Sequence, residues 1–256
     1  MRLRHVSYKA IEFYVPDEQT TDSVEASDVG MQHWFNSSLR STLTYAEQVW
    51  HVNSFVQDNL LNVLEVFCGF GMSTASIDSS RIEKHVAFDI DEGCCEAFQF
   101  LRPEADVIIA DTYFATVIAT KIHKFDYILI EHNAMTVYKA IRDEVERGFL
   151  DAIFNSEPRY VAFVDSAKVK EHLHYKTYSA FFEMSIENST GYVREVDRLF
   201  RRIYGYHIKA CAHDGINYTY LFEKSSQQAD TYDILDTRTV VDLKYFKDLG
   251  YIDVEV

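Results

Sequence analysis

The stretch Asn62-Val-Leu-Glu-Val-Phe-Cys-Gly-Phe-Gly-Met-Ser-Thr74 decides the fold of this chain. Its first half is apolar enough to form a strand that is buried on both faces, as in parallel sheets. The run breaks at Gly69 and Gly71, and the small residues that follow predict the start of a helix. Glycines between a strand and a helix let a ligand approach the backbone and meet the free N–H groups of the helix start. The stretch therefore predicts an α/β sheet that holds a nucleotide-like ligand at this turn.

The turn is not the dinucleotide fingerprint, which requires a glycine where this chain has Thr74. It resembles motif I of the class I S-adenosylmethionine-dependent methyltransferases, in which an acidic residue precedes a glycine-rich turn, here residues 65–71. Phe67 departs from that motif, because many members have glycine at this place. The wider segment 64–74 is also similar to elements of small-molecule O-methyltransferases. The resemblance implies that the residues in contact with S-adenosylmethionine include Glu65, Phe67, Gly69 and Gly71.

The composition fits one α/β domain with additions at its ends. A chain of 256 residues is long enough to bury a sizeable core. Its 25 basic and 40 acidic residues give a net charge of −15, which repels phosphate backbones and anionic lipid. No membrane partner is expected, and a nucleic-acid partner would require a local basic patch. The four cysteines lack zinc-binding spacing, so we expect reduced thiols and a cytoplasmic protein.

Three regions are predicted along the chain. Thr44 to Glu47 fits a capping box and predicts the start of a helix. One face of this helix is formed by Val49, Val52, Val56 and Leu60, and the helix leads to the strand before the glycine turn. A strand-like run from Ala10 to Val15 ends at Pro16, and residues 240–249 could form a short amphipathic element. We predict an N-terminal cap or extension over residues 1–43, a methyltransferase-like domain over 44–224 and a C-terminal extension over 225–256.

Four more apolar runs follow the glycine turn, and each closes on polar residues: His85–Asp91, Asp106–Thr112, Phe125–Asn133 and Tyr160–Ser166. Helical patterns separate them, at residues 92–101 and about 137–154, and a further helix covers about 190–204. Asp214-Gly215 then lies between two strand-like runs, which is a strong hairpin signal. The pattern predicts a doubly wound, mostly parallel seven-stranded sheet with helices on both faces and a C-terminal antiparallel hairpin. This arrangement resembles the class I methyltransferases over about residues 60–224.

Acidic residues at the strand ends are candidates for cofactor binding. Asp89 ends the second strand, where an acid can accept hydrogen bonds from both ribose hydroxyls of a nucleoside. Asp91 is the expected N-cap of the helix over residues 92–101. The family resemblance implies that Asp111, with Thr112, faces the adenine ring. The alternative is that these acids only terminate strands.

The fourth run carries Glu131-His132-Asn133 and lacks the Asp/Asn-Pro-Pro-Tyr/Phe tetrad of amino-directed nucleic-acid methyltransferases. No Pro-Cys pair is present for cytosine-C5 chemistry either. We predict that the catalytic residues are Glu131, His132 and Asp165, and that Glu131 also borders the cofactor. His132 could act as the general base. In the less favoured alternative, Glu131 and Asp165 hold a magnesium ion that orients an acceptor hydroxyl, although Ser166 follows Asp165 where that family usually has asparagine.

Two further clusters are weighed as binding surfaces. The helix over residues 190–204 places four arginines on one side, which could hold phosphate or an acidic partner: Arg194, Arg198, Arg201 and Arg202. A solvated face balanced by Glu195 and Asp197 is favoured over that role. His172 and His174, between lysines, are interpreted as surface residues in preference to metal ligands.

The predicted function is methyl transfer from S-adenosylmethionine to a hydroxyl or amine of a small-molecule or protein acceptor. One alternative is a nucleic-acid methyltransferase that acts with a partner. Another is a non-catalytic subunit that keeps the methyltransferase fold. The sequence does not identify the acceptor.

Overall fold

A computed structural model shows how the predicted elements assemble. It describes residues 3–8, 11–16, 39–59, 61–69, 71, 73, 77–131, 144–166, 189–215, 217–224 and 232–237. His132, the His172 and His174 pair, and residues 240–249 lie outside the described residues.

The centre of the molecule is an eight-stranded sheet in the order β10-β8-β9-β7-β6-β3-β4-β5. Its strands are β3 (Leu61–Val66), β4 (Ile82–Asp89), β5 (Asp106–Ile109), β6 (Tyr127–Ile130), β7 (Tyr160–Ser166), β8 (Tyr206–His213), β9 (Asn217–Lys224) and β10 (Asp233–Asp236). Only β9 runs against its neighbours in this sheet; every other described pairing is parallel. The predicted fold class is confirmed, including the hairpin of β8 and β9.

The predicted number of seven strands is wrong, because β10 adds an eighth beside β8. This strand lies within the predicted C-terminal extension. Tyr232 precedes it and donates a hydrogen bond to Asp197 Oδ2 at 2.9 Å. A four-residue strand has little signal of its own, and its position depends on the exposed edge that β8 offers.

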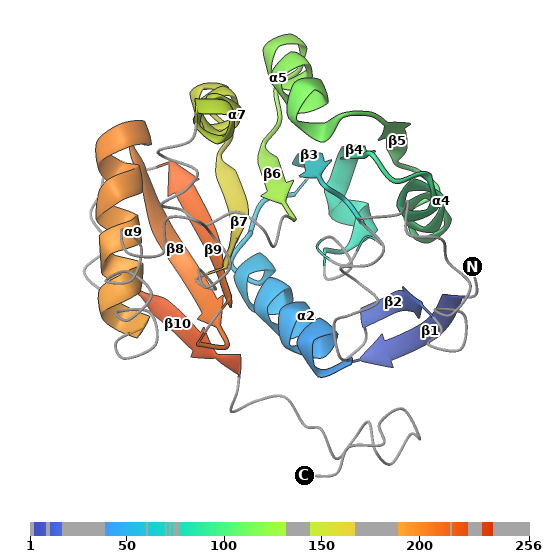
Figure 1. The fold of residues 1–256 in the computed structure, drawn as a ribbon, viewed down its shortest axis with the longest axis horizontal. Helices are drawn as coiled ribbons and strands as arrows, with labels where there is room; N and C mark the ends of the chain where they lie inside the picture. The colour runs from blue at the N-terminus through green and yellow to red at the C-terminus, as the bar shows by residue number, and fades with distance from the viewer. Residues whose placement is uncertain are drawn as a thin grey trace.

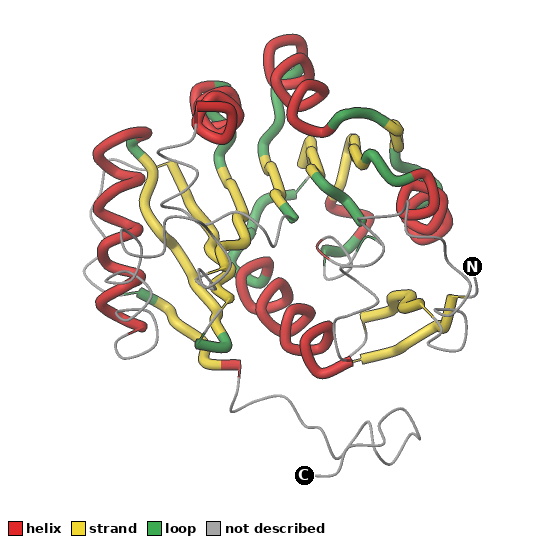
Figure 2. The backbone as a smooth tube through the Cα atoms, viewed as in Figure 1, coloured by secondary structure: helices red, strands yellow, loops and turns green. Residues whose placement is uncertain are grey.

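Helices cover both faces of the sheet (Figure 1). α5 (Thr112–Ile122), α7 (Glu144–Asn155) and α9 (Ser189–Tyr204) lie on one face, which we call the α9 face. α2 (Leu39–Asn53) and α4 (Glu92–Leu101) lie on the other, the α2 face. A hairpin of β1 (Leu3–Tyr8) and β2 (Ile11–Pro16) lies beside α2, and a short 3-10 helix, η2 (Ser79–Arg81), precedes β4. Figure 2 shows the main strands as one continuous layer between these helices.

α2 begins at Leu39, before the predicted capping box, so residues 44–47 lie inside the helix and not at its start. Val49 and Val52 are buried as predicted, whereas the buried Val56 lies beyond the end of the helix at Asn53. Two polar side chains attach α2 to the sheet layer. Gln48 Oε1 accepts from Thr219 Oγ1 of β9 at 2.8 Å, and Asn53 Oδ1 accepts from the Tyr127 hydroxyl of β6.

The predictions for α4 and α9 are confirmed. α4 spans the predicted residues, and Asp91 caps it by accepting from the Cys94 N–H at 2.9 Å. On α9 the apolar face is buried, while Arg198 pairs with Glu195 at 2.7 Å and Arg201 with Asp197 at 2.6 Å. These two arginines belong to an ion-paired, solvated face, which is the interpretation that the sequence favoured over phosphate binding.

All four cysteines are buried free thiols. Within the described ranges, no helix is both long and apolar enough to cross a membrane.

Candidate functional site

The glycine turn lies where the strand order reverses. The chain passes from β3 outward to β4 and β5 and then returns to β6 on the other side of β3. In open α/β sheets, ligands bind beyond the carboxyl ends of the strands at such a point. The site is therefore described from the ends of β3, β4, β5 and β6.

The backbone of the turn enters the left-handed region three times, at Phe67 (φ 58°), Gly69 (φ 48°) and Gly71 (φ 78°). Glycine adopts this region without the Cβ penalty that other residues meet there. At Gly71 space is limiting too, because an added Cβ would lie 3.0 Å from Phe98 Cδ2 on α4. Gly71 is thus required both by the turn and by the close packing of α4.

Phe67 takes a conformation that costs about 1–2 kcal/mol in a residue with a Cβ. Its ring packs on Tyr113 of α5 and Phe149 of α7, at centroid distances of 5.2 and 6.0 Å. The Tyr113 hydroxyl in turn donates to Glu146 at 3.1 Å. Aromatic pairs contribute about 0.5–1.5 kcal/mol each, which offsets the backbone cost. This cluster explains how phenylalanine can stand where the resembling motif has glycine.

Asp89 connects the turn to the end of β4. Its Oδ2 accepts from the Gly69 N–H and its Oδ1 from the Asp91 N–H, each at 3.0 Å. Burial raises the pKa of this carboxyl, although the two backbone bonds lower it. Its predicted contact with the ribose stays a prediction. The carboxylate stands beside the turn, as that contact requires.

Glu131 is the most unusual acid of the site. Its N–H donates to the Val66 carbonyl at 2.9 Å, which places it beside the end of β3. The residue is 8% exposed; the Tyr45 and Ser73 hydroxyls reach its carboxylate, but neither oxygen is fully satisfied by hydrogen bonds of normal geometry among the described residues. Burial raises its pKa well above 4.5, and the charges of Glu65 and Asp89 raise it further. A buried carboxyl with unused acceptor positions is ready for a cation or a hydrogen-bond donor.

Tyr45 and Ser73 are site residues that the sequence analysis missed. The Tyr45 hydroxyl of α2 is 2.8 Å from Ser73 Oγ. Burial, and then the charge of Glu131, raise the pKa of Tyr45 well above 10. Both hydroxyls also act on Glu131, because their hydrogen bonds lower its pKa against the effect of burial. The local sequence carries no signal for this contact, since it depends on how α2 docks on the sheet.

Glu65, predicted to contact the cofactor, has its carboxylate buried on the α2 face of the sheet. Its Oε2 is 3.2 Å from His85 Nε2 on β4, and both side chains are fully buried. The His85 ring packs edge-on against Phe98 at 5.3 Å. The predicted contact of Glu65 with the cofactor stays a prediction. His85 was missed as its partner, although Val63 and His85 occupy paired positions on β3 and β4.

The structure places Glu131 and Asp165 on opposite faces of the sheet. Asp165 is fully buried on the α9 face, where it accepts a hydrogen bond from the Tyr192 hydroxyl of α9. Glu131 lies on the α2 face with Tyr45 and Ser73. The register explains the difference: Ile130 pairs with Phe163, so Glu131 follows on the level of Val164 and not of Asp165.

Because they lie on opposite faces, these two residues do not fit a magnesium ion between them, and the predicted catalytic role of Asp165 stays a prediction. Within the described ranges, no group of three or more His, Cys, Asp or Glu side chains could hold a metal ion. His132 lies outside the described residues, so its role as a base stays a prediction.

Asp111 and Thr112 lie at the end of β5. Asp111 is exposed and caps α5 by accepting from the Phe114 N–H at 3.0 Å. Thr112 is buried, and its Oγ1 has no hydrogen-bonding partner among the described residues. Their predicted position at the adenine ring stays a prediction.

No protein-family model and no curated protein sequence matches the chain. Among solved structures, magnesium protoporphyrin IX methyltransferase from Synechocystis PCC 6803, with bound S-adenosylmethionine, matches 82% of this chain and 99% of that chain at 10% identity and a TM-score of 0.49. TYW2 of M. jannaschii, also in complex with S-adenosylmethionine, matches 87% of both chains at 12% identity and a TM-score of 0.43. A TehB-like methyltransferase from Corynebacterium glutamicum matches 69% of this chain and 87% of that chain at 13% identity and a TM-score of 0.43.

The chain has a doubly wound, Rossmann-like α/β fold with a C-terminal antiparallel hairpin. That assignment rests on the strand order, the reversed β9 and the glycine turn at the end of β3. At these low identities the matches define neither a substrate nor an activity.

Proposed function

We propose that the chain binds S-adenosylmethionine at the glycine turn and transfers its methyl group to a hydroxyl or amine. The observation that carries the proposal is the position of the left-handed turn, between Asp89 at the end of β4 and Glu131 at the end of β6. A nucleoside placed at the turn would have a carboxylate on either side.

The chemistry of the site suits a cationic cofactor. S-adenosylmethionine carries a sulfonium and an ammonium group, and Glu65, Asp89 and Glu131 surround the turn with negative charge. Because Glu131 is buried with unused acceptor positions, it is the carboxylate that gains most from a cation. Asp89 would hold the ribose, and the backbone at Gly69 and Gly71 would let the cofactor approach closely.

The bound cofactor supplies an activated methyl group, so the protein's part is to align the acceptor and remove a proton where needed. Tyr45 and Ser73 orient the Glu131 carboxyl. His132, the next residue along the chain, is the proposed base for the acceptor. The proposed acceptor is a small molecule or a protein, because the net charge of −15 opposes free nucleic acid and Arg198 and Arg201 are ion-paired.

Calorimetric titration with S-adenosylmethionine and S-adenosylhomocysteine tests the proposal. We expect both to bind, and the cationic S-adenosylmethionine to lose more affinity than the neutral thioether in Glu131→Gln. Because the variant loses one charge-assisted interaction, its affinity for S-adenosylmethionine should fall by about 10-fold or more. A chain that binds neither compound would contradict the proposal and favour a non-catalytic role for the fold.

The acceptor class has its own test. Salt-sensitive oligonucleotide binding that is lost when Arg198 and Arg201 are changed to glutamate would favour a nucleic-acid substrate instead.

A further inference from the structure

Helix α5 has its apolar and polar sides reversed. Its buried residues are Thr112, Thr116, Ala119 and Thr120, whereas Phe114, Ile118 and Ile122 are 70, 44 and 67% exposed. The Thr116 and Thr120 hydroxyls donate to carbonyls one turn earlier, at 2.7 and 2.8 Å, so the small inner side is satisfied within the helix. A surface helix normally buries its large apolar residues.

The three exposed residues are spaced four apart and form one ridge along α5, here called the α5 ridge. A continuous apolar ridge of this kind in water marks an interaction surface.

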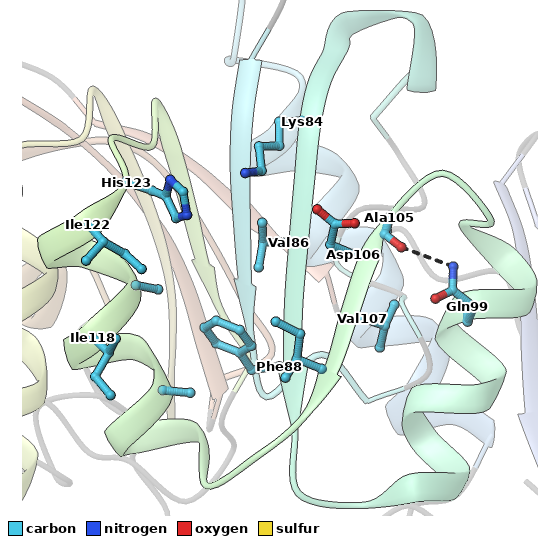
Figure 3. A pocket seen from close by; sticks show the side chains of 13 residues that line it. Lys84, Val86, Phe88, Gln99, Ala105, Asp106, Val107, Ile118, Ile122 and His123 are labelled. Carbon is cyan, nitrogen blue, oxygen red and sulfur yellow. Dashed lines mark hydrogen bonds between the residues drawn. The ribbon is translucent and has the colours of Figure 1, made fainter.

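The α5 ridge borders an apolar groove of about 620 Å³ between α5 and the strands β4 and β5 (Figure 3). Figure 3 shows Ile118 and Ile122 on one side of the groove and Val86 and Phe88 of β4 beside them. Ile108 of β5, which is 46% exposed, also lines the groove. Ridge and groove thus lie next to each other on one surface.

The same surface ends at the free edge of the sheet. β5 is the last strand in the order, and no described strand pairs with its outer side. Natural edge strands are commonly protected by charges, prolines or bulges. β5 has one charge, Asp106, and exposes Ile108 and Ile109 at 46 and 54%.

We propose that this surface binds a second copy of the chain around a two-fold axis, with the α5 ridge of each copy in the groove of the other. A two-fold interface uses the same patch on both copies, so the patch must be complementary to itself. A ridge beside a groove meets that requirement in shape. A small apolar ligand would fill the groove but leave Phe114 and the β5 edge exposed.

The charges of the patch agree with a second copy. Lys84, Asp106 and His123 lie toward one end of the groove (Figure 3). Lys84 and Asp106 have opposite signs, and neither forms an ion pair with another described residue. The patch is therefore nearly balanced in a chain of net charge −15, so two copies can approach here with little repulsion.

Sedimentation velocity of the full chain over the micromolar range tests the proposal. We expect a species of twice the 29.8 kDa chain mass. Ile118→Asp should weaken the dimer about 100-fold or more, because each interface buries the new charge twice. Val145→Asp on α7 is the matched control: Val145 is 67% exposed and lies outside the groove, so this variant should remain dimeric.

Ile118→Ala keeps the surface uncharged and should weaken the dimer by a smaller factor. Circular dichroism of all variants checks that each remains folded. A wild-type chain that is monomeric throughout, or an Ile118→Asp chain that stays dimeric, would overturn the proposal. A monomeric wild type that forms a defined complex with another protein would do so as well, and would assign the groove to that partner.

Discussion

Glu131 and Asp165 both stand at the ends of central parallel strands, yet their surroundings on the two faces of the sheet differ. Asp165 lies on the α9 face among aromatic residues, and Tyr192 satisfies it. Glu131 lies on the α2 face beside two other acids, and within the described part the Tyr45 and Ser73 hydroxyls satisfy its carboxylate only in part. An acid that its own fold satisfies supports structure, whereas one left unsatisfied stores free energy that a ligand can release.

The largest effect is expected at the turn itself. Gly71→Val should reduce S-adenosylhomocysteine binding by more than about 100-fold, because it adds backbone strain and a clash with Phe98. Gly205→Val is the control on the α9 side: Gly205 has φ +75° but nothing within 4 Å of an added Cβ. That variant should lose about 1–2 kcal/mol of stability and keep its binding. Retained binding in folded Gly71→Val would remove the turn from the cofactor site.

The second largest effect is expected on stability, at Asp165. Asp165→Ala should lower the free energy of unfolding by about 2–4 kcal/mol, because it leaves the buried Tyr192 hydroxyl without its acceptor. Chemical denaturation measures this change. Combining it with Tyr192→Phe in a double-mutant cycle should recover part of the loss, since both members of the pair are then absent. Fully additive losses would show that the two residues do not act together.

Replacing Glu131 should have the opposite effect on stability to replacing Asp165. Burial raises the folded-state pKa of Glu131 above 4.5, so the folded protein loses stability as pH rises from that value through the raised pKa. Glu131→Gln removes this loss, so the variant should be more stable than wild type at neutral pH and similar to it below pH 4.5.

Thermal unfolding across pH measures the difference between the two proteins. Because S-adenosylmethionine would supply a cation to Glu131, saturating cofactor should flatten the pH dependence of the wild type. A wild type that is already the more stable protein at neutral pH would show that the Tyr45 and Ser73 hydroxyls offset the cost of burying the Glu131 charge.

The smallest effect is expected at Phe67, whose ring packs toward the α9 face while its backbone shapes the turn. Phe67→Ala keeps the left-handed strain and loses the contacts with Tyr113 and Phe149. Phe67→Gly loses the same contacts but relieves the strain, so it should be the more stable variant by about 1 kcal/mol. Denaturation midpoints of the two variants compare them directly, and equal stability would mean that the positive φ carries no cost.

The local sequence alone determined the features whose causes lie within a few residues. The glycine turn, the bounds of α4 with its Asp91 cap, and the Asp214-Gly215 hairpin all follow from backbone preference, capping and turn chemistry. Together these signals were sufficient for the fold class. They also placed Asp89 and Glu131 at strand ends on the same edge of the sheet, with the glycine turn of β3 between them, since parallel strands end on one edge.

Only the tertiary structure decided which side chains meet. Successive side chains of a strand point to opposite faces, and Glu131 of the β6 end lies level with Val164 of β7, one residue before Asp165. Asp165 therefore lies on the opposite face from Glu131. The contact of Tyr45 with Ser73, the pairing of His85 with Glu65 and the addition of β10 depend on docking between elements far apart in the chain. Such contacts leave no local pattern, because each is stabilised by burial and geometry that arise only when the sheet and its helices have assembled.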